Sequence, residues 1–156
     1  MTTLLERAGT HLLACCGQPR YRTAWLIGVP LSGKTTLARQ LCEHHNWCYI
    51  NYTLEPGYFD QLQGRLEAYQ PGDLLQALRI WGAACERSVM LVDELDATLA
   101  CWSSDQRRLF AAQASRLGDL PHGLILVSSL LDLETLTPLL PESDFPPYFN
   151  LSGVRP

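Results

Sequence analysis

The sequence lacks several features that would assign it to a specialised class of protein. It contains no long basic run and its net charge is −4, which argues against a domain whose main task is gripping nucleic acid by bulk electrostatics. No uninterrupted apolar run approaches the length of a membrane span. The N-terminus shows no basic region followed by an apolar core and a cleavage site, so we expect a cytoplasmic protein without a signal peptide.

Paired metal-type cysteines are also missing. The six cysteines show no C-x-x-C pair and no spacing typical of zinc ligands. Several of them lie in apolar stretches, where a reduced cysteine behaves as a small hydrophobic residue. We therefore expect free thiols that serve packing: Cys15, Cys16, Cys42, Cys48, Cys85 and Cys101.

What is present is the composition of an ordinary globular domain. The 156 residues are 47% hydrophobic and 18% charged, which suffices for one core without disulfide or metal support. We expect a single domain over residues 1–156, with a leading helix over 1–17 and a nucleotide-binding core over 23–151.

Short apolar runs alternate with amphipathic stretches along this core. Strands that are apolar throughout and alternate with helices indicate a parallel sheet covered on both faces, that is, an α/β three-layer sandwich. Strands are expected at residues 23–27, 47–52, 88–92, 124–127 and 148–151, and helices at 34–45, 71–85 and about 103–118.

A loop directly after the first expected strand satisfies the pattern G-x-x-x-x-G-K-[ST]. Its glycines let consecutive N–H groups converge on phosphate oxygens, and the following helix adds its positive N-terminal end. We expect Lys34 to reach the β- and γ-phosphates, the Thr35 hydroxyl to bind Mg²⁺, and Thr36 to donate to the α-phosphate. Its place between a buried strand and an amphipathic helix favours this interpretation over a plain glycine turn. The expected nucleotide-binding residues are Gly28, Val29, Pro30, Leu31, Ser32, Gly33, Lys34, Thr35 and Thr36.

Two carboxylates, Asp93 and Glu94, end the expected strand over 88–92. In open α/β sheets, ligands bind at this edge of the strands. We predict that Asp93 holds Mg²⁺ through water, since this ion keeps much of its hydration shell. Glu94 is expected to polarise the attacking water as general base. Asp96 is a rival for that role, and the alternative for Glu94 is that it merely begins a solvated loop.

Two serines, Ser128 and Ser129, follow the expected strand over 124–127. A polar side chain at that strand end can sense the γ-phosphate or orient the water. The alternative is a serine that caps the helix that follows. The sequence leaves both interpretations open.

Together, the phosphate loop, the acidic pair and the strand-end serines resemble the ASCE group of P-loop NTPases, specifically a minimal AAA-like core. The resemblance implies the sheet order 5-1-4-3-2, with ATP and Mg²⁺ as ligands. The chain departs from the AAA pattern in two ways. We expect no C-terminal helical lid, and the sequence shows no counterpart of the arginine that in AAA proteins acts on a neighbour's nucleotide. Arg107, Arg108 and Arg116 are the candidate substitutes.

A narrower resemblance is to BrxF, the small P-loop protein of BREX-type phage-defence systems. It rests on the length, the leading helix and the run Tyr-Ile-Asn-Tyr-Thr-Leu-Glu at residues 49–55. It implies an ATPase that assembles into a ring or binds DNA within a multi-protein defence complex. The expected partners are ATP and either further copies of the chain or other proteins of such a complex, with DNA as a further candidate and no membrane.

Three function classes are compatible with these features. The first is an ATPase whose hydrolysis drives assembly or partner switching. The second is a non-hydrolysing, nucleotide-gated interaction module, and the third is a small-molecule kinase, which usually needs an arginine-bearing lid. Absence of the N-K-x-D signature of GTPases favours ATP over GTP. Tyr58 and Phe59 lie where AAA rings place aromatic pore residues, although packing of the connection onto the sheet is the commoner role.

Overall fold

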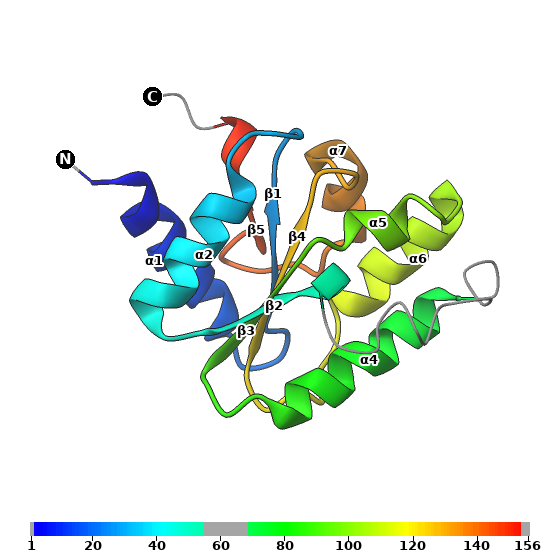
Figure 1. Cartoon of the computed structure of the whole chain (residues 1–156), viewed down its shortest axis with the longest axis horizontal. Helices are drawn as coiled ribbons and strands as arrows, with labels where there is room; N and C mark the ends of the chain where they lie inside the picture. The colour runs from blue at the N-terminus through cyan, green and yellow to red at the C-terminus, as the bar shows by residue number, and fades with distance from the viewer. Residues whose placement is uncertain (1, 55–68, 154–156) are drawn as a thin grey trace.

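A single five-stranded sheet lies between two layers of helices in the computed structural model, which describes residues 2–54 and 69–153 (Figure 1). The strands are β1 (Thr23–Ile27), β2 (Cys48–Asn51), β3 (Val89–Asp93), β4 (Gly123–Ser128) and β5 (Tyr148–Asn150). Their order is β2-β3-β4-β1-β5, and every neighbouring pair is parallel. This confirms the predicted α/β class and the predicted order 5-1-4-3-2, which is the same order counted from the other edge.

Helices cover both faces of the sheet. One face carries α1 (Leu4–Cys16) and α2 (Lys34–His45), and the other carries α4 (Pro71–Ala84) and α6 (Ser104–Ala114) (Figure 1). The short helices are α5 (Asp96–Leu99), α7 (Leu133–Leu136), η1 (Tyr52–Leu54), η2 (Thr137–Leu139) and η3 (Leu151–Gly153). No helix in the described part of the chain is both long and apolar enough to cross a bilayer.

The central strands are apolar on both faces because both faces are covered. In β1, Trp25 and Ile27 join the core beneath α4 and α6, whereas Ala24 and Leu26 join the core beneath α1 and α2. The same alternation holds in β3 and β4, since successive side chains of a strand point to opposite faces. Buried parallel strands therefore appear in the sequence as continuous apolar runs.

Helices α1 and α6 begin with reciprocal capping bonds. Thr3 accepts from the Glu6 amide while the Glu6 carboxylate accepts from the Thr3 amide, and Ser103 and Gln106 do the same for α6. These reciprocal bonds satisfy donors that the first helical turn leaves open.

The end of α6 differs from the prediction. The sequence suggested Gly118 as its stop, but the helix ends at Ala114. Ser115 is buried and its hydroxyl accepts a 2.9 Å hydrogen bond from the indole of Trp25. The next amide, that of Arg116, bonds three residues back rather than four, so the chain leaves the α-helix there.

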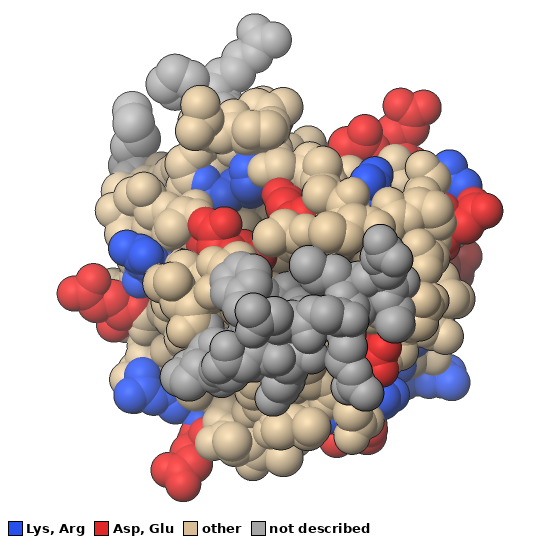
Figure 2. Space-filling view, turned by 45° about the vertical axis from the view of Figure 1, so that its right-hand side comes forward, with Lys and Arg blue, Asp and Glu red and all other residues tan. Residues whose placement is uncertain are grey.

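Charge is mixed over the visible surface. On the face shown in Figure 2, Lys and Arg side chains alternate with Asp and Glu, and the described residues of that face form no continuous basic patch. This agrees with the net charge of −4 and with the absence of a long basic run.

Candidate functional site

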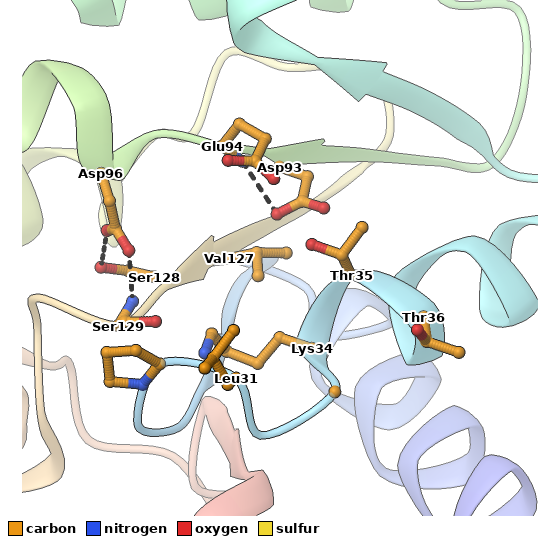
Figure 3. A pocket seen from close by; sticks show the side chains of 12 residues that line it. Leu31, Lys34, Thr35, Thr36, Asp93, Glu94, Asp96, Val127, Ser128 and Ser129 are labelled. Carbon is orange, nitrogen blue, oxygen red and sulfur yellow. Dashed lines mark hydrogen bonds between the residues drawn. The ribbon is translucent and has the colours of Figure 1, made fainter.

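A cavity of about 460 Å³ opens where the C-terminal ends of β1, β3 and β4 meet (Figure 3). These strands are neighbours in the sheet, so the loop after β1 and the polar residues after β3 and β4 come together at one edge. The cavity is lined by Pro30, Leu31, Gly33, Lys34, Thr35, Thr36, Asp93, Glu94, Asp96, Val127, Ser128 and Ser129.

The first turn of α2 has no side-chain cap. Gly33 occupies its N-cap position and supplies no hydrogen bond from a side chain, whereas α1, α4 and α6 all begin with a capping box. The residues of that turn, Lys34, Thr35 and Thr36, line the cavity. Unpaired N–H groups at a helix start carry partial positive charge and bind anions. The wall of the cavity therefore includes a helix start without a side-chain cap.

The two glycines of the loop serve different purposes. Gly33 has φ of 93°, a left-handed conformation that only glycine adopts without strain, while the space around it is open. Gly28 is not in that region; instead, a Cβ there would lie 2.7 Å from the Ser32 hydroxyl and 3.3 Å from Leu151 Cβ. Gly33 is thus needed for its backbone conformation, and Gly28 is needed because no space remains for a side chain.

Lys34 lies folded over the loop. Its side chain is buried, and Nζ donates to the Val29 carbonyl at 2.8 Å and to the Ser32 hydroxyl at 3.4 Å. Burial lowers the pKa of Lys34 from its ordinary value, and the nearby carboxylates of Asp96 and Asp93 oppose that shift. Both acceptors of this charged amine are neutral oxygens, and an ammonium group forms stronger hydrogen bonds with an anion than with neutral acceptors.

Three of the expected nucleotide-binding residues support the loop without lining the cavity. These residues are Gly28, Val29 and Ser32. The Val29 amide donates at 2.7 Å to the hydroxyl of Ser152 in η3, so the segment after β5 is hydrogen-bonded to the loop. Ser152 therefore contributes to the shape of the loop.

Two lining residues adopt left-handed backbone conformations without being glycine. Leu31 has φ of 63° and its side chain is fully exposed, and Glu94 has φ of 66°. Such conformations cost about 1–2 kcal/mol and persist where the surroundings enforce them, often at functional sites. Both lie on the rim of the same cavity.

Asp93 is the buried carboxylate of the site, with 3% of its surface exposed. Tyr49 Oη donates to its Oδ2 at 2.9 Å, and the Glu94 amide donates to its Oδ1 at 2.8 Å. Burial raises the pKa of Tyr49 to about 12, and the bond to Asp93 acts in the same direction, so the phenol keeps its proton and donates. Thr35 lies across the cavity from this carboxylate (Figure 3).

Asp96 connects the end of β3 to the end of β4. Its Oδ1 accepts from the Ser128 hydroxyl at 2.7 Å and its Oδ2 accepts from the Ser129 amide at 2.8 Å (Figure 3). The Ser128 hydroxyl is buried and also accepts from the amides of Leu130 and Leu131. These bonds close the turn after β4, whereas the helix that follows, α7, is capped by Asp132, so Ser128 does not serve as the helix cap that the sequence left as an alternative.

Ser129 is the serine better placed to act as a sensor. It is half-buried, it lines the cavity, and its hydroxyl forms no hydrogen bond with the described residues. Its position is fixed through its amide, which is held by Asp96. A sensor role, if assigned to this strand end, therefore falls to Ser129 rather than Ser128.

The donor set fits a magnesium ion that arrives with a nucleotide. Among residues 2–54 and 69–153, no group of three or more His, Cys, Asp or Glu side chains could hold a metal ion by itself. Mg²⁺ is usually bound by one or two protein oxygens together with substrate phosphates. The Thr35 hydroxyl and the Asp93 carboxylate both line the cavity and supply oxygen ligands of that kind.

No arginine lines the cavity within the described part of the chain. Of the three candidate arginines, Arg107 donates to the Leu99 carbonyl, Arg116 donates to the Leu139 carbonyl, and Arg108 pairs with Asp105 at 3.3 Å. They are therefore engaged elsewhere. Tyr58 and Phe59 lie outside the described residues.

Sequence reasoning missed two contributors to the site. Alternation along β2 places Tyr49 on the same face as Asn51, but only the register seen in the structure pairs Asn51 with Asp93, so the sequence alone gave no signal for this contact. Ser152 had none, since it is an isolated polar residue after the last strand. Asp96 was singled out, but as a rival base rather than as a connection between two strand ends.

Comparison with known proteins found a solved structure to report and no family. No family model matches the chain, and no curated protein matches it. A solved structure, the Walker-type ATPase of Pyrococcus abyssi, aligns with 17% identity and a TM-score of 0.46 over 93% of this chain and 53% of that protein. The chain thus spans about half the length of that ATPase.

Proposed function

We propose that the chain binds ATP with Mg²⁺ in this cavity and hydrolyses it to ADP and inorganic phosphate. The observation that carries this proposal is the uncapped first turn of α2, with Lys34 folded beside it and the carboxylates of Asp93 and Glu94 opposite. A cation, a set of free N–H donors and two acids in one cavity are the groups that phosphoryl transfer uses.

The phosphates would occupy the N–H groups at the start of α2. Lys34 Nζ would leave the Val29 carbonyl, 2.8 Å away, and bind the β- and γ-phosphates. Thr35 and Asp93 would hold Mg²⁺, which neutralises charge on the phosphate oxygens when bound. Binding energy from these contacts fixes the γ-phosphate relative to the acids, and such positioning is the main task of the protein in this reaction.

Glu94 is the proposed general base. Its side chain is exposed, and its carboxylate forms no hydrogen bond with the described residues. Both carboxylate oxygens of Asp96, by contrast, already accept short hydrogen bonds. In the reaction, a water oxygen bonds to the γ-phosphorus, the bond to the β,γ-bridging oxygen breaks, and the water proton passes to Glu94.

Slow turnover by the isolated chain follows from the absence of arginine in the described lining of the cavity. An arginine at the transferring phosphoryl group is worth about 10³–10⁵ in rate in enzymes that use one. The same observation favours a second candidate, a nucleotide-gated interaction module that binds ATP without hydrolysing it. Full ATP binding without turnover, at any protein concentration and with any partner, would support this alternative.

Two substitutions test the first proposal. Lys34→Ala should abolish binding of a fluorescent ATP analogue and phosphate release, whereas Glu94→Gln should keep binding and lose turnover. Arg20→Ala and Glu134→Gln are the matched controls, because both residues are exposed and neither lines this cavity. Hydrolysis by Glu94→Gln at the wild-type rate would rule out Glu94 as the base.

The wider role that we propose is nucleotide-driven assembly or partner switching in the cytoplasm. The resemblance of residues 49–55 and of the leading helix to BrxF supports a place in a phage-defence complex, with DNA as a further candidate ligand. Molecular mass in solution, measured with and without ATP and Mg²⁺, tests the assembly step. A monomer under both conditions, alone and with partners, would contradict it.

A further inference from the structure

Tyr49 places its hydroxyl against the carboxylate that we assign to magnesium. It lies on β2, the edge strand beside β3, where the register pairs Tyr49 with Leu91 and Asn51 with Asp93. Paired residues of parallel strands point to the same face, so Tyr49 and Asp93 both face α2. The ring packs on the core beneath α1 and α2, and Oη reaches Asp93 Oδ2 at 2.9 Å.

The two oxygens of Asp93 are held from opposite sides. Oδ1 accepts from the Glu94 amide at 2.8 Å, and Oδ2 accepts from Tyr49. One hydrogen bond alone would leave the carboxylate free to rotate about its last bond, whereas two bonds to separate oxygens set its plane. Because Asp93 is 3% exposed, the orientation of its carboxylate depends mainly on these two donors.

Tyr49 is itself held by α2, the helix that carries Thr35. The Arg39 guanidinium lies over the Tyr49 ring, 5.6 Å from its centroid, which is within the range of a cation–π contact. Arg39 is one helical turn after Thr35, so the two lie on the same side of α2. Tyr49 therefore contacts both α2, which carries the proposed ligand Thr35, and the side chain of Asp93, the other proposed ligand.

We propose that Tyr49 is a positioning residue for magnesium: it fixes the plane of the Asp93 carboxylate and its distance from Thr35. This inference rests on the proposed function, since it presupposes that Asp93 and Thr35 hold Mg²⁺ with a nucleotide. Hydrogen-bond partners of metal-binding groups typically change metal affinity by about 10–100-fold when removed. A tyrosine that served packing alone would leave metal affinity unchanged when its hydroxyl is deleted.

The test is Tyr49→Phe, which removes the hydroxyl and keeps the ring. Binding of a fluorescent ATP analogue is titrated with Mg²⁺, and the same analogue is titrated in EDTA. We expect the Mg²⁺ concentration at half-effect to rise about tenfold or more, with affinity in EDTA within about twofold of wild type because the N–H groups of α2 are untouched. Tyr21→Phe is the matched control, since Tyr21 lines a different cavity.

The outcomes separate the two proposals. If the wild-type chain binds the analogue without any dependence on Mg²⁺, the magnesium part of the proposed function fails. If the wild type depends on Mg²⁺ and Tyr49→Phe has the same half-effect concentration, only the role of Tyr49 fails. Should Tyr49→Phe unfold, Arg39→Gln supplies the test, because Arg39 is exposed: a smaller shift in the same direction supports the inference, and no shift overturns it.

Discussion

Replacing Asp96 by Asn tests whether this residue holds the end of β4, as its contacts indicate. Asp96 accepts at 2.7 Å from the Ser128 hydroxyl and at 2.8 Å from the Ser129 amide. An asparagine offers one acceptor oxygen and one NH₂ donor, so whichever way it turns, one partner faces a donor. Ser128 cannot adapt freely, because its oxygen already accepts from the amides of Leu130 and Leu131.

The expected cost follows from these two bonds. A hydrogen bond to a charged group contributes about 1.5–3 kcal/mol, and a neutral one about 1 kcal/mol. Asp96→Asn loses one charged bond and weakens the other, so the free energy of unfolding should fall by about 2–3 kcal/mol. For a chain of this size that corresponds to a fall in Tm of about 5–10 °C.

Urea unfolding followed by far-ultraviolet circular dichroism measures this difference. Asp105→Asn is the control, since its side chain is 94% exposed and pairs with Arg108 at 3.3 Å. This substitution should change the free energy of unfolding by less than about 0.5 kcal/mol. Unchanged stability of Asp96→Asn would refute the reasoning. If stability were unchanged while ATP turnover was lost, Asp96 rather than Glu94 would be the base.

Three further outcomes are expected. Gly33→Ala should lower stability by about 1 kcal/mol and weaken ATP binding, because φ is 93° there; Gly118→Ala, also in open space but without positive φ, should be near neutral by the same unfolding assay. Native protein should show one fast-reacting thiol with an aromatic disulfide reagent, Cys101, which is exposed; a Cys101→Ser protein with an equal fast phase would contradict this. Asp132, the N-cap of α7, accepts from the Thr135 amide, which lowers the pKa of its carboxyl. A carboxyl whose pKa is lower in the folded than in the unfolded protein stabilises the fold at pH values above its unfolded pKa, which is near 3.8. That stabilisation is lost as the pH falls through the lower pKa of the folded state. Asp132→Ala should therefore cost about 0.5–1 kcal/mol at neutral pH and less in acid, and an equal cost at both pH values would exclude the charge effect. In the same thiol assay, slow reaction with the reagent is expected for the cysteines whose thiol pKa is raised by burial to about 11–12, namely Cys15, Cys16 and Cys42.

The parts of the fold that sequence predicted are those that local pattern determines. Apolar runs identified the strands and amphipathic stretches identified the main helices, since each pattern depends on neighbours within one strand or a few turns. The phosphate loop was equally local. Parallel strands then bring their C-terminal ends to one edge, so Asp93 and Ser128 were expected near the loop.

What the sequence left open depends on contacts between distant segments. Tyr49 and Asp93 are 44 positions apart, and Asp96 and Ser128 are 32 apart, so each pair depends on the register of neighbouring strands. The choice between sensor and cap at Ser128 had the same origin, because only the tertiary structure places a carboxylate beside it. The left-handed backbone of Leu31 was also beyond pattern reasoning, since leucine seldom adopts it.

The amine of Lys34 can be labelled selectively because of the composition of the chain. Lys34 is the only lysine in the sequence. An amine-acylating reagent can therefore react with two amines of this chain, the side chain of Lys34 and the α-amino group of the first residue. Burial lowers the pKa of Lys34, which favours the reactive neutral form, but the same burial restricts access. The extent of acylation, read by mass spectrometry, thus reports on whether this one amine is covered, with no background from other lysines.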